Sequence, residues 1–286
     1  MKPFREIDTK DPSAVAREVS EVYSTIYPDG DPEFVDRAFG WLHMWFTGQY
    51  KDYQAIDASY HDYEHTLQGT LCLVRILLRR YESGAKPEIP QRLFEMTVLA
   101  IMMHDTGYLK HAEDTEGTGA KYTLVHVHRS AGFAEQFLLE HGFPIEEVRS
   151  IKNMIYCTGV DNKLEDIPFA NEIERMMGAA VATADLLGQM AASDYVEKLA
   201  ALFAEFTEAA AFHPDRPGYI HRFKDLDHMF EGTPGFWECY VIPKINSHCL
   251  GLYKYLNSPY PDGNNEYLDR IEANIDKVRK INEQKK

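Results

Sequence analysis

Three features that would assign a protein to a special class are missing from this sequence. The 4 cysteines lie far apart, so the chain has none of the Cys-x-x-Cys pairs of zinc knuckles and redox motifs. No apolar run approaches the roughly 20 residues that span a bilayer, and the segment after Met1 has no apolar signal core. We therefore expect free thiols in a reducing compartment, a cytoplasmic location and no membrane partner.

Positive charge is also scarce. The chain has 30 lysines and arginines against 45 aspartates and glutamates, which gives a formal net charge of -15. Such an excess repels phosphate at long range and argues against a nucleic-acid polymer or an anionic membrane as partner. A nucleotide substrate remains compatible with it, because a bound dication would invert the local field. The charge does not decide whether copies of the chain form a homo-oligomer.

Alternating polar and apolar residues bounded by turn dipeptides, the pattern of strands, are essentially missing, whereas helix signals are frequent. Asp11-Pro12 and Asp31-Pro32 each place a capping carboxylate before a proline suited to a first helical turn. Apolar residues then recur at helical spacing after both pairs. Further helices are expected at 64–83, 90–105, 126–141, 145–157, 171–191, 193–211, 234–256 (interrupted by Pro243) and in the charged tail Glu266–Lys286. The sequence predicts an all-α protein.

The expected helices divide into three parts of one globular unit. We expect N-terminal helices in residues 1–57, a central core in 58–205 and a C-terminal helical extension in 206–286. The polar, glycine-bearing stretch 110–124 interrupts the core, either as a mobile loop over a site or as an inert surface loop.

The run Thr97–Met103 is apolar and ends abruptly in His104 and Asp105. A buried helix seldom ends in an imidazole and a carboxylate without a partner, because burying an unpaired charge is costly. Imidazole nitrogen with carboxylate oxygen is the ligand mix that holds Zn, Mn, Fe or Mg near a reacting phosphate. The alternative is a polar pair that hydrogen-bonds to neighbouring backbone.

Other segments offer the same two kinds of side chain. His61 and His65 are four residues apart, so on a helix they would share a face, although 12 histidines produce some such pairs by chance. Asp185 is the only charge between Gly178 and Gly188, where a carboxylate needs either an arginine or a metal. His126 and His128 are two apart on a predicted helix, so at most one of them should join a common site.

Taken together, these segments resemble the HD-domain superfamily of metal-dependent phosphohydrolases. His65, then His104–Asp105, then Asp185 follow the order of that family's H…HD…D signature, and the resemblance covers roughly residues 58–190. Tyr60-His61-Asp62-x-x-His65 is also similar to the YHNxxH motif of cyclic-nucleotide phosphodiesterases, with Asp62 where asparagine is usual. His128-Arg-Ser-Ala-Gly resembles the HPxxG-type segment of two-metal members, but 151–158 has no histidine where several such members place one.

The resemblance implies a helical HD-domain core that holds one or two divalent ions, Mn, Mg, Zn or Fe. His65, His104, Asp105 and Asp185 would be the ligands, with His128 as a further one and Asp105 as the bridge to a second ion. The metal would activate water for attack on a phosphate ester, and His61 would protonate the leaving oxygen. Lys110 and Arg129 either contact the phosphate or are solvated surface residues.

The implied partner is a small phosphorylated substrate, either a nucleotide monoester or a cyclic phosphodiester. Two other functions stay open on the same fold: a di-iron oxygenase, which would need further histidine ligands, and a non-catalytic sensor of a small molecule. Aromatic residues of the C-terminal third would wall a base-binding pocket or belong to the core: Phe212, Tyr219, Phe223, Phe230, Phe236, Trp237 and Tyr240.

Overall fold

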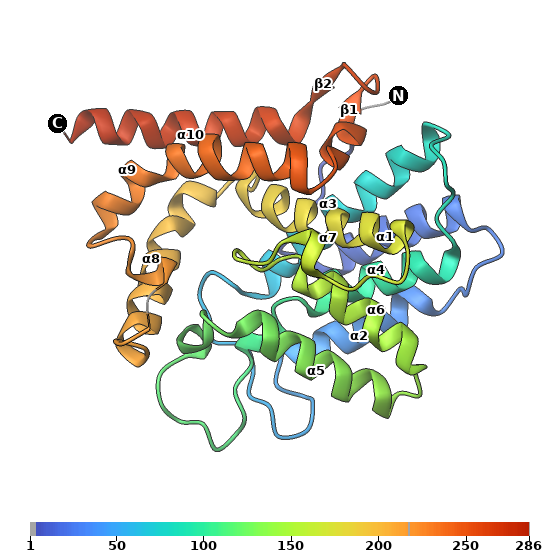
Figure 1. Ribbon diagram of the computed structural model, residues 1–286, viewed down its shortest axis with the longest axis horizontal. Coiled ribbons are helices and arrows are strands. Elements are labelled where there is room, and N and C mark those ends of the chain that lie inside the picture. Colours follow the sequence, from blue (N-terminus) through green and yellow to red (C-terminus); the bar gives the residue numbers. More distant parts are fainter. Residues whose placement is uncertain (1–3, 217, 286) are drawn as a thin grey trace.

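The computed structural model describes residues 4–216 and 218–285, and over these residues the protein is all-α, as predicted (Figure 1). Its only strands there are β1 (Asn257–Ser258) and β2 (Asn264–Asn265), an antiparallel pair in which Asn257 lies opposite Asn265. The α-helices are α1 (Pro12–Ile26), α2 (Phe34–Phe46), α3 (Tyr63–Glu82), α4 (Gln91–Met103), α5 (His126–Glu140), α6 (Ile145–Tyr156), α7 (Glu172–Met190), α8 (Tyr195–Phe212), α9 (Leu226–Phe236) and α10 (Glu266–Gln284). None of the described helices is long and apolar enough to cross a membrane.

The helices α3 and α7 form the centre of the molecule and pack against each other along their length. The Asp62 carboxylate starts α3 by accepting a hydrogen bond from the backbone N–H of His65 at 2.8 Å. A Cβ atom on Gly188 of α7 would lie 2.7 Å from the backbone oxygen of Gln68, so a side chain there would push the two helices apart. The alanine- and glycine-rich sequence of α7 therefore serves a close helix crossing, which brings Asp185 beside α3.

The remaining helices surround this pair. The helix α4 packs against α3, α6 and α7 and is buried from Phe94 to Met103, so the segment ahead of His104 is enclosed as its apolar sequence predicts. The helix α5 lies on α6, and α1 lies on α3. The charged tail docks as the peripheral helix α10, which runs along α9 and α7 at the top of the view in Figure 1.

The C-terminal third differs from the expected helix over 234–256. The helix α9 begins earlier, at Leu226, because the Asp225 carboxylate caps it by accepting from the N–H of His228. Pro234 lies inside α9, and beyond it the chain continues as two π-helical segments on either side of Pro243, Trp237–Val241 and Lys244–His248. Because proline lacks the N–H of the regular ladder, a wider backbone pattern there has a local cause.

The stretch 110–124 is held down rather than left free. The Gln54 side chain donates to the backbone oxygens of His111 and Asp114, and the Thr118 hydroxyl donates to Glu208 of α8 at 2.7 Å. The N–H of Gly119 donates to the Asp57 carboxylate. These bonds tie the stretch to both neighbouring parts of the chain and favour the interpretation as a fixed surface loop.

The turn after Asp105 is locked onto the start of α5 through Gly107. Its N–H donates to the Ser130 hydroxyl at 2.8 Å, and a Cβ atom at this position would lie only 2.0 Å from the backbone oxygen of His126. We expect Gly107→Ala to lower the free energy of unfolding by about 3 kcal/mol or more, because the backbones must separate.

Gly132 provides the control, because it lies within α5, the helix that Gly107 packs against, and a Cβ there would meet nothing within 4 Å. Gly132→Ala should raise the free energy of unfolding by about 0.5–1 kcal/mol through helix propensity. Urea unfolding followed by circular dichroism measures both changes. Equal effects of the two substitutions would contradict the close approach at Gly107.

Candidate metal centre

Four side chains from three separate helical segments converge on one point inside the protein. The Nε2 atom of His65 lies 3.1 Å from Oδ2 of Asp105 and 3.3 Å from Oδ1 of Asp185. The Nε2 atom of His104 lies 3.2 Å and 3.4 Å from the same two oxygens. Donor atoms bound to one ion at about 2.1 Å in tetrahedral geometry would lie roughly 3.4 Å apart. The ligand atoms of His65, His104 and Asp185 all lie within 4.8 Å of one another, so these three residues could hold a metal ion, and Asp105 contacts both histidines beside them.

The hydrogen bonds around the cluster leave its donor atoms available. The His104 ring is bound through Nδ1 to the backbone oxygen of Ile101 at 2.7 Å, so Nε2 faces the other ligands. His104 Nε2 and Asp105 Oδ2 are buried without a hydrogen-bond partner among the described residues. A chain of side chains orients Asp185: Tyr60 donates to Gln189, and Gln189 donates to the Asp185 carboxylate at 3.1 Å. Unpaired buried donor atoms that face one another fit a cation between them.

The charges of the four groups depend on one another. Burial lowers the pKa of His65, but the carboxylates of Asp105 and Asp185 outweigh it and raise that pKa to about 9. The same two carboxylates raise the pKa of His104 well above its usual value. Burial raises the pKa of Asp105, yet the adjacent His104 and His65 hold it well below its usual value. Without a metal, the cluster is thus two buried ion pairs.

This arrangement predicts how stability changes with pH in the metal-free protein. The pKa of His65 is about 9 in the folded state and 6.5 ordinarily, so its contribution is complete below pH 6.5 and is lost as the pH rises to 9. We expect the free energy of unfolding to fall by on the order of 3 kcal/mol over that range. Urea unfolding in a chelator at several pH values measures it.

Metal affinity should follow the opposite trend, because imidazole must lose its proton to bind a cation. Metal titrations at pH 6.5 and 9 would therefore show tighter binding at the higher pH. Unfolding free energies of the metal-free protein that stay constant or rise over this range would contradict the assigned ion pairs.

His61 lies beside the cluster but not as the sequence spacing predicted. Asp62 caps α3, so His61 precedes the helix instead of sharing a helical face with His65, and the two rings are still only 5.5 Å apart. Its Nδ1 lies 2.5 Å from Oε2 of Glu205, and its ring stacks on Tyr108 at 4.4 Å. The Nε2 atom of His61 could therefore contact a molecule in a cavity that this residue lines.

Glu205 was not predicted as a site residue. It comes from α8, is 3 % exposed, and also accepts the backbone N–H groups of Tyr60 and His61 at 2.7 and 3.3 Å. In the sequence it is one of several glutamates on a predicted helix, and no local pattern marks it as buried. Its function depends on a contact between residues 144 positions apart.

The structure brings His126, and not His128, to the centre. His126 begins α5, and its Nε2 atom lies 3.8 Å from Oδ1 of Asp105. Burial lowers the pKa of His126, which favours the neutral form that binds metals. His128 is exposed and lies against Tyr156, with ring centroids 5.5 Å apart, so it does not join the cluster. Two positions along a helix turn the side chains in nearly opposite directions.

The two cations expected at the substrate have structural partners instead. Lys110 is 5 % exposed and lies 2.9 Å from the Asp57 carboxylate. The guanidinium of Arg129 donates to the backbone oxygens of Gly107 and Leu109 and lies 3.5 Å from the centre of the Tyr122 ring. Both residues fasten the turn behind Asp105 rather than line the cavity.

A cavity of about 210 Å³ opens beside the cluster, with His61, His65, Asp105 and Asp185 in its wall. Most of the remaining wall is apolar or aromatic, and its cations are Arg222 and Lys244. Of the seven aromatic residues of the C-terminal third, three line it: Phe223, Phe236 and Tyr240. The others lie elsewhere, with Phe230 and Trp237 in the core, Phe212 exposed and the side chain of Tyr219 outside the described part.

Comparison with known proteins places the chain in a family. Among curated proteins, none matches it. The model of the Npun_R2479-like family matches residues 13–258, a range that includes the four clustered residues and the whole wall of the adjoining cavity. Because the match covers most of the chain, this protein belongs to the Npun_R2479-like family.

Proposed function

We propose that the protein is a metal-dependent phosphohydrolase of the HD-domain type that acts on a small phosphate ester. The observation that carries the proposal is the convergence of His65, His104, Asp105 and Asp185 on one buried point, with His61 in the same cavity. The order of these residues along the chain agrees with the resemblance to the H…HD…D signature.

The residues would divide the work in the following way. The two histidines and two aspartates would hold a divalent ion, Mn, Mg, Zn or Fe, and Asp105 has its second oxygen turned toward His126, where a second ion would find two further donor atoms. A bound ion supplies Lewis-acid activation of water and neutralises charge on the phosphoryl group.

His61 is suited to donate a proton to the leaving oxygen. Glu205 accepts from Nδ1 of its ring, while stacking on Tyr108 restricts the ring's orientation. The His61 side chain is 15 % exposed, whereas the side chains of His65 and His104 are 2–3 % exposed, so His61 is more accessible than they are. A proton donor in this position would act on the substrate rather than on the metal.

The wall of the cavity indicates the kind of ester. Lys244 and Arg222 replace Lys110 and Arg129 as the cations available to phosphate. Aromatic and aliphatic side chains would contact the organic part, which suits the base of a nucleotide monoester or a cyclic phosphodiester. The proposal is therefore a nucleotide phosphatase or phosphodiesterase.

One observation favours a second candidate, a di-iron oxygenase. His126 adds a further histidine next to Asp105, and its ring lies 6.0 Å from that of His61. Histidine-rich centres suit iron, and an apolar cavity suits a substrate that is oxidised rather than hydrolysed.

The deciding experiment is product release from a panel of nucleotides, cyclic nucleotides and generic phosphodiesters. Metal-free protein is reloaded separately with Mn, Mg, Zn or Fe(II) and assayed with and without oxygen. Metal-dependent phosphate-ester cleavage that does not require oxygen supports the hydrolase. Oxygen consumption limited to the iron-loaded protein would instead support the oxygenase, and tight metal binding with neither reaction would indicate a sensor.

A further inference from the structure

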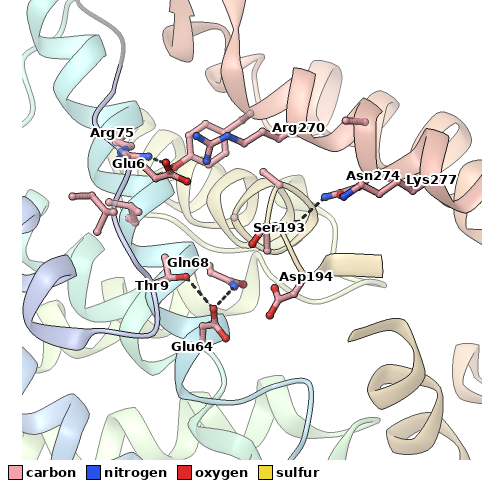
Figure 2. A pocket seen from close by; sticks show the side chains of 17 residues that line it. Glu6, Thr9, Glu64, Gln68, Arg75, Ser193, Asp194, Arg270, Asn274 and Lys277 are labelled. Atoms are coloured by element: carbon pink, nitrogen blue, oxygen red, sulfur yellow. Dashed lines mark hydrogen bonds between the residues drawn. The ribbon is translucent and has the colours of Figure 1, made fainter. Parts of the chain in front are cut away.

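A second cavity, of about 340 Å³, lies next to the metal-bearing helix (Figure 2). One face of α3 forms one wall through Glu64, Gln68, Leu71 and Arg75. A face of α10 forms the opposite wall, and the turn between α7 and α8 and the segment 6–9 close the sides. This cavity plays no part in the proposed hydrolysis.

The cavity has a fixed frame. The Asn274 side chain is 3 % exposed and donates to the backbone oxygens of Met190 and Ala192, which ties α10 to the end of α7. On the opposite side, Arg75 donates to the hydroxyl of Tyr267 at 3.2 Å. Between these two attachments the wall consists of small residues: Gly188, Ala191, Ala192, Ser193 and Ala273. The two helices are therefore held apart where no large side chain fills the space.

Cations without counter-ions line the α10 side. Among residues 4–216 and 218–285, neither Arg270 nor Lys277 forms an ion pair, and Lys277 donates only to the neutral amide of Asn274. Arg75, on the α3 side, is 3 % exposed and already has partners, because its Nη2 atom donates to the backbone oxygen of Arg5 at 2.6 Å and its Nε atom lies 3.9 Å from Glu18. Figure 2 shows Arg270 reaching across from α10 toward Arg75. Two cations without an ion pair thus line one cavity, and such groups attract an anion even in a chain of net charge -15.

The other end of the cavity is polar but differently charged. Glu64 accepts from Thr9, Gln68 and Lys198, and Asp194 pairs with Lys10, so each carboxylate has a cation outside the cavity wall. These carboxylate oxygens could accept hydrogen bonds from the hydroxyl groups of a ligand. Glu6 is the one wall carboxylate without an ion pair within the described ranges, and Figure 2 shows it near Arg75.

We propose that this cavity binds a small hydroxylated organic phosphate. Arg270 and Lys277 would hold the phosphate group, because guanidinium and ammonium groups donate strongly to its oxygens. Glu64, Thr9 and Ser193 would contact the hydroxyl groups. The volume suits a sugar phosphate, and the site is separate from the cavity beside the metal cluster.

The test is calorimetric titration of the full chain with ribose 5-phosphate, with ribose and inorganic phosphate as comparison probes. We expect ribose 5-phosphate to bind more tightly than either probe alone. The double variant Arg270→Gln, Lys277→Gln should bind it about tenfold or more weakly, since two charge-assisted contacts are lost. Glu6→Gln should bind it more tightly, because a competing negative charge is removed.

Two control variants make the result decisive. Lys280→Gln removes the same charge from an exposed position on α10 outside the cavity, and it should leave binding unchanged. Lys244→Gln alters the cavity beside the metal cluster instead. Loss of binding in Lys244→Gln but not in the double variant would overturn the proposal, as would absence of ribose 5-phosphate binding to the unmodified protein.

Discussion

Replacing Asp105 by alanine is expected to abolish stable binding of divalent metal. Its Oδ2 atom lies within 3.1 and 3.2 Å of the Nε2 atoms of His65 and His104, and its Oδ1 atom faces His126. The substitution removes a negative ligand that both histidines contact, so metal affinity should fall by at least about 100-fold, because losing even a supporting contact costs roughly 10–100-fold. Metal content after dialysis, measured by elemental analysis, gives the result.

Two further variants separate this effect from misfolding. Asp105→Asn keeps the shape of the side chain and removes its charge, so it should fold and still bind metal poorly. Asp161→Ala removes an exposed carboxylate from the loop after α6 and should retain the full metal content. An unchanged metal-to-protein ratio in a folded Asp105 variant would refute the assignment of this residue as a ligand.

His61→Ala is expected to lower turnover strongly without removing the metal. A positioned proton donor contributes about 10²–10⁴-fold to the rate, and the ring of His61 is held for this task by Glu205 and Tyr108. The measurement pairs kcat on the substrate found in the panel with metal content of the same sample. His248→Ala is a suitable control, because that histidine is exposed and lies outside the cavity.

Glu205→Gln distinguishes positioning from catalysis at the same site. Glutamine can still accept from the ring of His61 and keep its orientation, so kcat should fall less than in His61→Ala. For the His61→Ala variant, loss of bound metal would contradict the role of proton donor and would make His61 a metal ligand.

Much of the fold could be predicted from local signals. Capping carboxylates and apolar spacing locate most helices, because those effects act within a few residues. Asp11–Pro12 begins α1 as predicted, whereas α2 begins only at Phe34, so Asp31 does not cap it and Pro32 lies before its first turn. The C-terminal third was predicted less well, because Asp225 starts α9 earlier, Pro234 lies inside that helix and two π-helical segments flank Pro243. Prolines mark irregular backbone in a sequence without specifying which irregularity forms.

In the site, too, residues with a local sequence signal could be predicted, whereas residues that depend on distant contacts could not. His104 and Asp185 were recognisable because a charge in an apolar helix has few explanations other than a buried partner. Glu205 and Gln189 were not, because they contact His61 and Tyr60, which lie far away along the chain. Lys110 and Arg129 have the charge of phosphate ligands, but the backbone and carboxylate oxygens around them already use it.

The first turn of α3 takes part in both cavities. His65 points to the metal cluster, its neighbour Glu64 lines the second cavity, and Lys198 binds the carboxylates of both Glu64 and Asp62, the cap that holds the backbone of His65. A shift of this turn caused by an occupant of one cavity would therefore move a wall residue of the other cavity. Thermodynamic reciprocity then applies: if the phosphate ligand changes the affinity for metal by some factor, metal changes the affinity for that ligand by the same factor.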